Sequence, residues 1–466
     1  MPSVAIPLVG PTYTNRSLPV SSQITRNFYI EVNETGGEIL SFLPFPGLKL
    51  LATSGTGKGR GVGVHKNEAY TVVGSELYKM DSNNNTSLLG TISGSNRCKL
   101  ISDGVSLVIT TGNGKPYTWD GGTLTQGTDA DLASSNTVTF INRRVVYDGN
   151  GGDVIFADLD SALSINSLNV LSEESLDDDT IAVEAHRKQV FVFGVDTIAP
   201  YYPIQTGNPP YALITNSVQD IGLEAIHSIA KNKDYVYFLA NDLQPYRIAG
   251  LDIQPIGNPA ICQAIRSYGG ASDAFGDCFS FDGLRFYFLS FPNGNESWLL
   301  NEQSGQWTNL ASGNIGNQHY MSGYAFAYDK HIVGDRRNGN IYELDFATFT
   351  DNSESIHRQR DTVSINGRFF GVPGAKVFMT KLELVIEPGA SLVTAKADIM
   401  MQYSDDNGRT WSSERWSSIG EQGDYTLKLS WLSLGWFYNR MFRFTMSDPI
   451  KWVLISASAD VEMGIG

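Results

Sequence analysis

The residues that come closest to a chemical motif lie at 402–411, which read QYSDDNGRTW. They follow the spacing S-x-D-x-G-x-T-W, whose fixed positions are Ser404, Asp406, Gly408, Thr410 and Trp411. A carboxylate, two hydroxyls and an indole ring in so short a stretch could bind or cleave a sugar. They could equally close a β-hairpin, because Asn-Gly favours the positive φ angles of a tight turn and an aspartate accepts backbone N–H bonds within it.

This spacing is called an Asp box and occurs in many sialidase-type β-propellers. Sialidase chemistry also requires an arginine cluster, a Tyr–Glu nucleophile pair and an acid, and usually several boxes. One box occurs here, outside the repeated region that precedes it. We therefore predict that these five residues form a structural hairpin turn, with Trp411 packed under the loop, and that they are not catalytic.

Three other stretches start like ligand-binding motifs and then depart from them. The glycine-rich segment 54–63 has no Ser or Thr after Lys58 and lacks the dinucleotide-loop spacing, so it predicts a flexible linker. DSNNNT at 81–86 begins like a calcium loop but has Thr86 where glycine is needed. SEESLDDD at 172–179 is typical of an exposed acidic loop. We expect no metal and no cofactor.

The remaining reactive side chains form no catalytic pattern. The six histidines include no HExxH, no GxSxG elbow occurs, and the carboxylates single out no glycosidase pair. The three cysteines are far apart and form no CxxC pair, which predicts free, reduced thiols. The many Tyr and Trp rings could stack on sugars, but they are more typical of a β core. We expect no enzyme, and the sequence assigns no binding residue.

Composition indicates an all-β protein. The chain has 466 residues, with 47 Gly, 21 Tyr and 23 Phe, and long helical patterns are scarce. Its net charge of −15 argues against a protein that grips nucleic acid, whereas an acidic lining would let DNA slide past. The first residues do not read as a signal peptide, and no run approaches the ~18 apolar residues of a membrane span.

Three regions follow one another along the chain. Residues 1–58 are rich in proline and are expected to form an irregular arm. In residues 59–365 a polar turn repeatedly leads into an apolar, aromatic strand and then an answering strand. Tyr70, Leu107, Val145, Val190, Tyr235, Phe286 and Ile332 mark these strands. Their spacing predicts a β-propeller of six or seven blades, with unrelated hairpins in stacked sandwiches as the alternative.

The last region, residues 366–466, changes in composition. Five of the eight tryptophans lie in its last 56 residues. Polar and apolar residues alternate in several stretches, which include 381–387, 398–403, 425–431 and 440–446. This alternation predicts a separate antiparallel β-sandwich.

Several ordered stretches together resemble a known family. They are TRNFYIEV (25–32), LPFPGLKLL (43–51), KGRGVGVHKNEAYTVVGSELYKMD (58–81), IRSYGGASDAFGDCFSFDGLRFYFLSFP (265–292), QWTNL (306–310), GDRRNGNIYELD (334–345) and LGWFYNRMFRFTMSDP (434–449). In this order they resemble the tail-hub proteins of short-tailed bacteriophages, also called packaged-DNA stabilisation or tail nozzle proteins. The likeness covers nearly the whole chain.

The resemblance implies a structural protein of the virion tail, made in the host cytoplasm. It implies a homohexameric ring below the portal and its adaptor, which continues the DNA channel and retains the packaged genome. It also implies docking of tail spikes or fibres and of a needle or plug, with genomic DNA passing without specific binding. No catalytic residue carries over. The alternatives are a glycan-binding or glycan-processing tail propeller and a propeller that serves as a protein-interaction scaffold.

Overall fold

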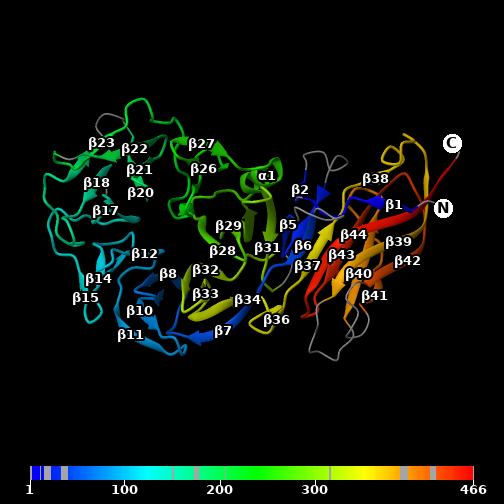
Figure 1. Ribbon diagram of the computed structural model, residues 1–466, viewed down its shortest axis with the longest axis horizontal. Coiled ribbons are helices and arrows are strands. Elements are labelled where there is room, and N and C mark those ends of the chain that lie inside the picture. The colour runs from blue at the N-terminus through cyan, green and yellow to red at the C-terminus, as the bar shows by residue number, and fades with distance from the viewer. Residues whose placement is uncertain are drawn as a thin grey trace.

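The computed structural model describes residues 3–10, 12–14, 22–32, 40–149, 152–172, 178–204, 206–313, 316–388, 397–419 and 427–464. The described chain forms two β bodies side by side, a propeller and a sandwich (Figure 1). The predicted all-β class and the propeller-plus-sandwich architecture are confirmed.

The described residues form a propeller of seven blades, each built on a four-stranded antiparallel sheet. In blades 1 to 6 the innermost strand is the first of the blade in the sequence. In blade 7 the innermost strand is β32. Blade 1 consists of β8 (Gly59–His65), β9 (Glu68–Val73), β10 (Glu76–Met80) and β11 (Thr86–Thr91). Blade 2 consists of β12 (Lys99–Ser102), β13 (Leu107–Thr110), β14 (Tyr117–Trp119) and β15 (Leu124–Gln126). Blade 3 consists of β16 (Val138–Ile141), β17 (Arg144–Asp148), β18 (Asp153–Phe156) and β19 (Val170–Ser172).

Blades 4 to 6 repeat this arrangement. Blade 4 consists of β20 (Thr180–His186), β21 (Gln189–Gly194), β22 (Ile198–Pro203) and β23 (Tyr211–Leu213). Blade 5 consists of β24 (Ala230–Lys231), β25 (Val236–Leu239), β26 (Pro245–Ala249) and β27 (Asp252–Pro255). Blade 6 consists of β28 (Phe275–Phe281), β29 (Leu284–Phe291), β30 (Glu296–Asn301) and β31 (Gln306–Leu310). A 3-10 turn, η1 (Ile226–Ser228), precedes β24, and the helix α1 (Pro259–Ser267) connects blades 5 and 6. Six of the seven apolar sequence markers lie in the second strand of a blade, and Tyr235 directly precedes the second strand of blade 5. The described residues give the larger of the two predicted blade numbers.

The turns between the first two strands of the blades explain why the sequence repeats there. Both central residues have positive φ in Lys66-Asn67 (50° and 60°), Asn142-Arg143 (49° and 63°), Asp282-Gly283 (49° and 79°) and Tyr328-Asp329 (56° and 57°). Two successive positive φ angles are those of a type I′ turn, whose twist matches that of a hairpin. The polar turn residues that precede the aromatic strands therefore set the hairpins of the propeller.

Blade 7 closes the ring with a strand from the N-terminal side. It contains β32 (Met321–Ala327), β33 (Lys330–Asp335), β34 (Asn340–Asp345) and β7 (Gly47–Thr53), and the short β35 (Thr350–Asp351) and β36 (Glu354–Ser355) extend it. β7 pairs with β34 in antiparallel register, from Gly47 opposite Asp345 to Thr53 opposite Asn340. Since β7 comes before blade 1 in the sequence, this pairing joins the two ends of the repeat.

The sandwich packs two sheets face to face. One contains β39 (Val377–Pro388), β42 (Leu427–Phe437), β44 (Trp452–Met463), β1 (Ser3–Ile6), β5 (Phe28–Val32) and β6 (Leu40–Pro44). The other contains β37 (Arg358–Asp361), β38 (Ile365–Asn366), β40 (Asp398–Ser404), β41 (Arg415–Ser418) and β43 (Asn439–Met446). Phe28 and Trp452 are fully buried between the sheets and stack with ring centroids 5.4 Å apart.

The expectation of an irregular N-terminal arm is wrong for its described residues. β1, β5 and β6 belong to the sandwich, β7 belongs to blade 7, and two short strands, β2 (Tyr13–Thr14) and β3 (Ser22–Gln23), pair with each other. The prolines do not prevent this, because Pro7 follows β1, Pro44 ends β6 and Pro46 precedes β7. In these places a missing N–H interrupts no ladder.

A further short strand, β4 (Thr25–Arg26), joins the two bodies. Arg26 lies opposite Asn309 of β31 in parallel register and opposite Gln359 of β37 in antiparallel register. One sheet therefore continues from blade 6 through β4 into the sandwich. The Nε of Arg26 donates to Asn309 Oδ1 at 2.9 Å, which adds a side-chain bond to the same junction.

Candidate functional site

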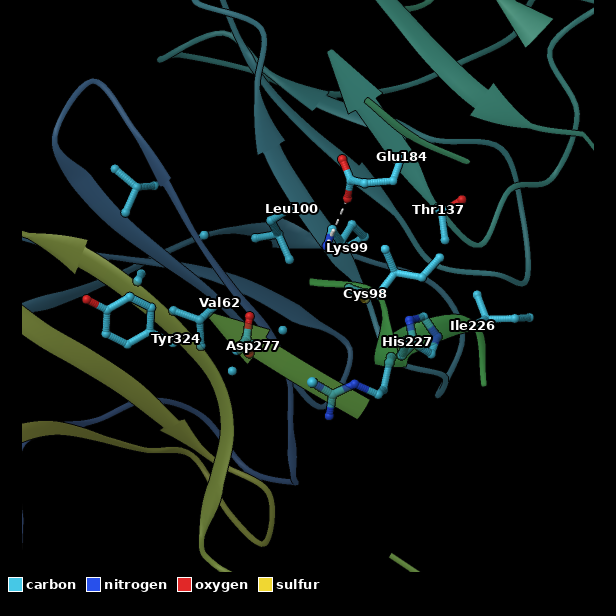
Figure 2. Close-up of a pocket in the computed structure, with 18 of the residues that line it drawn as sticks. Val62, Cys98, Lys99, Leu100, Thr137, Glu184, Ile226, His227, Asp277 and Tyr324 are labelled. Atoms are coloured by element: carbon cyan, nitrogen blue, oxygen red, sulfur yellow. Dashed lines mark ion pairs between the residues drawn. The ribbon is translucent and has the colours of Figure 1, made fainter. Parts of the chain in front are cut away.

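A group of charged side chains surrounds a cavity of about 330 Å³ at the centre of the propeller (Figure 2). Its walls come from the innermost strands of the blades and from η1. All seven blades contribute, with Val62, Lys99, Thr137, Glu184, His227, Asp277 and Tyr324 as one lining residue from each. This position makes the cavity the natural place to look for a ligand or a path through the molecule.

Glycines bring the inner strands close together. A Cβ on Gly61 would lie 2.4 Å from the carbonyl oxygen of Cys98, and one on Gly276 would lie 2.9 Å from that of Ser228. Gly61 belongs to the segment 54–63, for which we expected a flexible linker. That expectation is wrong for residues 59–63, which form most of β8. The glycines there serve a close approach of backbones.

Glu184 is the most enclosed charge of the cavity, with 3% of its side chain exposed. Its Oε1 accepts hydrogen bonds from Lys231 Nζ at 2.6 Å and from Thr139 Oγ1 at 2.9 Å, and its Oε2 lies 3.8 Å from Lys99 Nζ. Burial alone would raise the pKa of Glu184, but the two ammonium groups hold it below its usual value. A carboxylate on β20 is thus tied to lysines on β12 and β24, across three blades.

Asp277 and Arg97 lie on another side of the cavity. Burial raises the pKa of Asp277 to about 6, although Lys99 and Arg97 partly oppose this. The guanidinium of Arg97 donates to the carbonyl oxygen of Ser322 and lies 3.7 Å from the centre of the Phe275 ring. Burial also lowers the pKa of Arg97 to about 10.

The remaining lining groups offer no catalytic pair. Burial lowers the pKa of His227 to about 3, so its imidazole is a weak base, and burial raises the pKa of the Cys98 thiol to about 11. A nucleophile requires a base within hydrogen-bonding distance or a lowered pKa. Among the described residues, no group of three or more His, Cys, Asp and Glu could hold a metal ion. The cavity is a charged centre.

Its size also limits what can pass. A DNA duplex, whose major groove alone is about 12 Å wide, is far too large to thread it. A second cavity of about 670 Å³ adjoins it at Tyr324 and Phe326 and is lined by the 231–234 turn and Arg285.

The five residues of the Asp box come together in one turn after β40. Asp406 Oδ1 accepts from Ser404 Oγ at 2.7 Å, Arg409 N at 3.0 Å and Thr410 N at 2.8 Å, and its Oδ2 accepts from Thr410 Oγ1 at 2.5 Å. Gly408 has a φ of 87°. These bonds, that of Thr410 Oγ1 foremost, hold the pKa of Asp406 well below its usual range.

Trp411 lies beside this turn and against the sandwich. Its ring is 3.6 Å from where a Cβ of Gly408 would stand, and the guanidinium carbon of Arg443 lies 3.8 Å from the ring centre. Arg443 is in turn bound to the buried carboxylate of Asp361. The four hydrogen bonds that Asp406 accepts all come from residues of its own loop.

The other motif-like stretches also bind their own backbone. Asp81 Oδ1 accepts from the backbone N of Asn83 and of Asn85, at 2.9 and 2.8 Å. In the acidic run, residues 173–177 lie outside the described residues. Asp178 accepts backbone N–H bonds from the 195–197 turn. The three cysteines are free.

Sequence reasoning did not find the charged cluster at the propeller centre. A signal for it exists in IAVEAH (181–186), where one glutamate interrupts an apolar strand. The partner lysines cannot be read from the sequence, because they lie on strands whose proximity depends on the closed ring.

Two family models match the chain. The first, "Bacteriophage P22 Gp10, beta-propeller", matches residues 4–349, and the second, "Bacteriophage P22 Gp10, beta-sandwich", matches residues 363–462. The chain belongs to this family. The P22 Gp10 family is one of phage tail-hub or stabilisation proteins, so this member is a structural protein of a phage tail. The family implies a place in the virion.

Solved structures resemble parts of the chain at low identity. A computationally designed protein, Ika8, has a TM-score of 0.40 and 13% identity over 64% of this chain and 99% of its own. The Pan2 WD40 domain of Neurospora crassa has a TM-score of 0.39 and 8% identity over 70% and 89%. BamB of Moraxella catarrhalis has a TM-score of 0.38 and 10% identity over 70% of this chain and 96% of its own. The search of curated proteins gave no match.

Helices contribute little to this protein. Within the described residues, none is long and apolar enough to cross a membrane.

Proposed function

We propose that copies of this Gp10 family member form a ring, a homohexamer, below the portal and its adaptor. The ring continues the DNA channel, retains the packaged genome, and offers docking sites to tail spikes or fibres and to a needle or plug. The observation that carries this proposal is the match to the tail-hub family over residues 4–349 and 363–462. The two matches together include both the propeller and the sandwich.

The narrow propeller centre supports a channel between copies. The Glu184–Lys231 pair lies beside a cavity too small for a duplex, so DNA cannot pass along the axis of a single propeller. A ring of several copies encloses a wider opening without a change in any blade. In this arrangement the propeller is a rigid wall, and DNA does not run along its axis.

The charge of the propeller also suits a channel wall. Residues 59–365 hold 35 Asp and Glu against 20 Lys and Arg, which accounts for the whole net charge of −15. Several copies around one channel would repel the phosphates of DNA, so the genome could slide without a specific bond.

A premature stop codon early in this gene tests the proposal. We expect phage grown without a suppressor to package DNA and then lose it, with no tail structure below the portal in electron micrographs. The same phage grown in a suppressor host is the matched control and should retain its DNA. DNA-filled, tailed particles that fail to adsorb would contradict the proposal and indicate a peripheral receptor or glycan module.

A further inference from the structure

Four enclosed polar side chains face the central cavity with hydrogen-bonding capacity that the chain does not use. Arg97 and Lys99 are cations, and Asp277 and His227 are acceptors. They come from separate elements, because Lys99 lies on β12, His227 on η1 and Asp277 on β28. Figure 2 shows these three around one space. Groups of both signs thus meet at one cavity.

The two cations are only partly satisfied within the chain. Lys99 Nζ lies 3.8 Å from Glu184 Oε2, which is longer than a hydrogen bond. The Arg97 guanidinium donates to one carbonyl oxygen, that of Ser322, and lies over the Phe275 ring. Since a guanidinium carries five N–H donors, most of those of Arg97 remain. Both side chains can therefore bind an anionic group.

The two acceptors are also open. Burial raises the pKa of Asp277 to about 6, and the neighbouring cations and the backbone N–H of Tyr324 oppose this, so the carboxylate is ionised at pH 7. Burial lowers the pKa of His227 to about 3, so its ring is neutral and keeps one acceptor nitrogen. Within the described part of the chain, no side chain donates a hydrogen bond to either group.

We propose that the central cavity binds a small zwitterion, with its anionic group at Arg97 and Lys99 and its ammonium group at Asp277. A lone anion would face the carboxylate of Asp277, and a lone cation would face two cations. A molecule with both charges meets an opposite charge at each end, which compensates the water that it loses. A cavity of about 330 Å³ suits a ligand of a few carbon atoms.

The second cavity provides a way in. It shares Tyr324 and Phe326 with the central cavity and has a volume of about 670 Å³. Phe326 is 49% exposed, so solvent reaches the border between the two cavities. A small ligand can enter past this ring without a change in the blades.

Calorimetric titration of the purified full chain tests the proposal. The probes are glycine, β-alanine, γ-aminobutyrate and 5-aminopentanoate, which differ in the distance between their two charges. Butyrate and butylammonium, each with one charge, are the matched controls. We expect one member of the series to bind at least tenfold more tightly than either control. Equal binding of zwitterions and controls, or no binding of any zwitterion, would overturn the proposal.

Two variants assign the charges of the site. Asp277→Asn should weaken binding of the best zwitterion at least tenfold, and Lys99→Met should do the same from the anionic end. Lys58→Met, at an exposed lysine outside the cavity, is the control and should change the affinity less than twofold. Denaturation curves of each variant show whether it is folded. An unchanged affinity in folded Asp277→Asn would overturn the proposal.

A crystal structure with the best probe locates the ligand directly. We expect its density in the central cavity, between Asp277 and the two cations. Density elsewhere on the chain, or water alone in the cavity, would overturn the proposal. These results do not bear on the proposed ring, because all of them are obtained on the isolated chain.

Discussion

At the scale of residues, the centre of the propeller depends on charges that compensate one another. Glu184 is buried and accepts hydrogen bonds from Lys231 and Thr139. Removing one partner of such a pair leaves the other charge without compensation, which costs more than removing both. Glu184 is therefore a strong candidate for a stability test.

We expect Glu184→Gln to lower the free energy of unfolding by about 2 kcal/mol, less than for a fully buried pair because Lys231 is partly exposed. The double variant Glu184→Gln with Lys231→Met should lose less than the sum of the two single variants. Urea denaturation of the four proteins measures this coupling. Additive losses would contradict a coupled pair.

Buried acids make stability depend on pH. Burial raises the pKa of Asp277, and likewise those of Asp148 and Asp351, to about 6. In the unfolded chain an aspartate titrates near about 3.9, so the folded protein binds more protons between these values. The contribution of these groups to stability therefore grows as the pH falls from 7 towards 4 and is lost as the pH rises through 6.

Asp277→Asn removes one of these titrations without adding a charge. We expect the variant to be more stable than the wild type at pH 7, by at most about 3 kcal/mol, and this difference to shrink at pH 5. Denaturation curves at the two pH values test it. A difference that does not change with pH would contradict the raised pKa of Asp277.

The Asp box can be tested by removing its acceptor. Asp406 holds four donors from its own loop, so Asp406→Ala should lower the melting temperature of the sandwich by a few degrees without changing the propeller. Glu414→Ala, an exposed acid nearby, is the matched control and should have no effect. A sugar-cleaving activity that the Asp406 variant loses would contradict a structural role.

At the scale of elements, local patterns and distant pairings differ in how far they can be predicted. The aromatic strands and their turns could be read from the sequence, because pairs such as Lys66-Asn67 and Asp282-Gly283 set adjacent hairpins. β7 could not, because its partner β34 lies at the other end of the repeat. The same reason applies to β1, which pairs with β44.

The closing strand offers a matched pair of variants. Leu48 and Leu50 both lie in β7, but Leu48 is fully buried whereas Leu50 is exposed. We expect Leu48→Ala to lower the free energy of unfolding by about 2–5 kcal/mol and Leu50→Ala to change it by less than about 0.5 kcal/mol. Equal effects in thermal denaturation would show that β7 does not hold the ring closed.

At the scale of the whole molecule, the propeller axis and the path of DNA are separate in the proposed ring. Charged side chains line a narrow cavity on the axis, the acidic surplus lies in the propeller, and β4 joins the sandwich to blade 6. These features suit a rigid wall element that is repeated around a channel. They also explain why the candidate site could not be assigned from sequence motifs, since the relevant surfaces belong to the shape and charge of whole blades.

The most direct measurement is a cryo-electron microscopy reconstruction of the tail of DNA-filled virions. The account predicts several copies of this chain around the tail axis, with DNA density enclosed by the ring and none within any propeller. Density for DNA through the centre of a propeller, or copies of the chain placed only on the periphery of the tail, would contradict it.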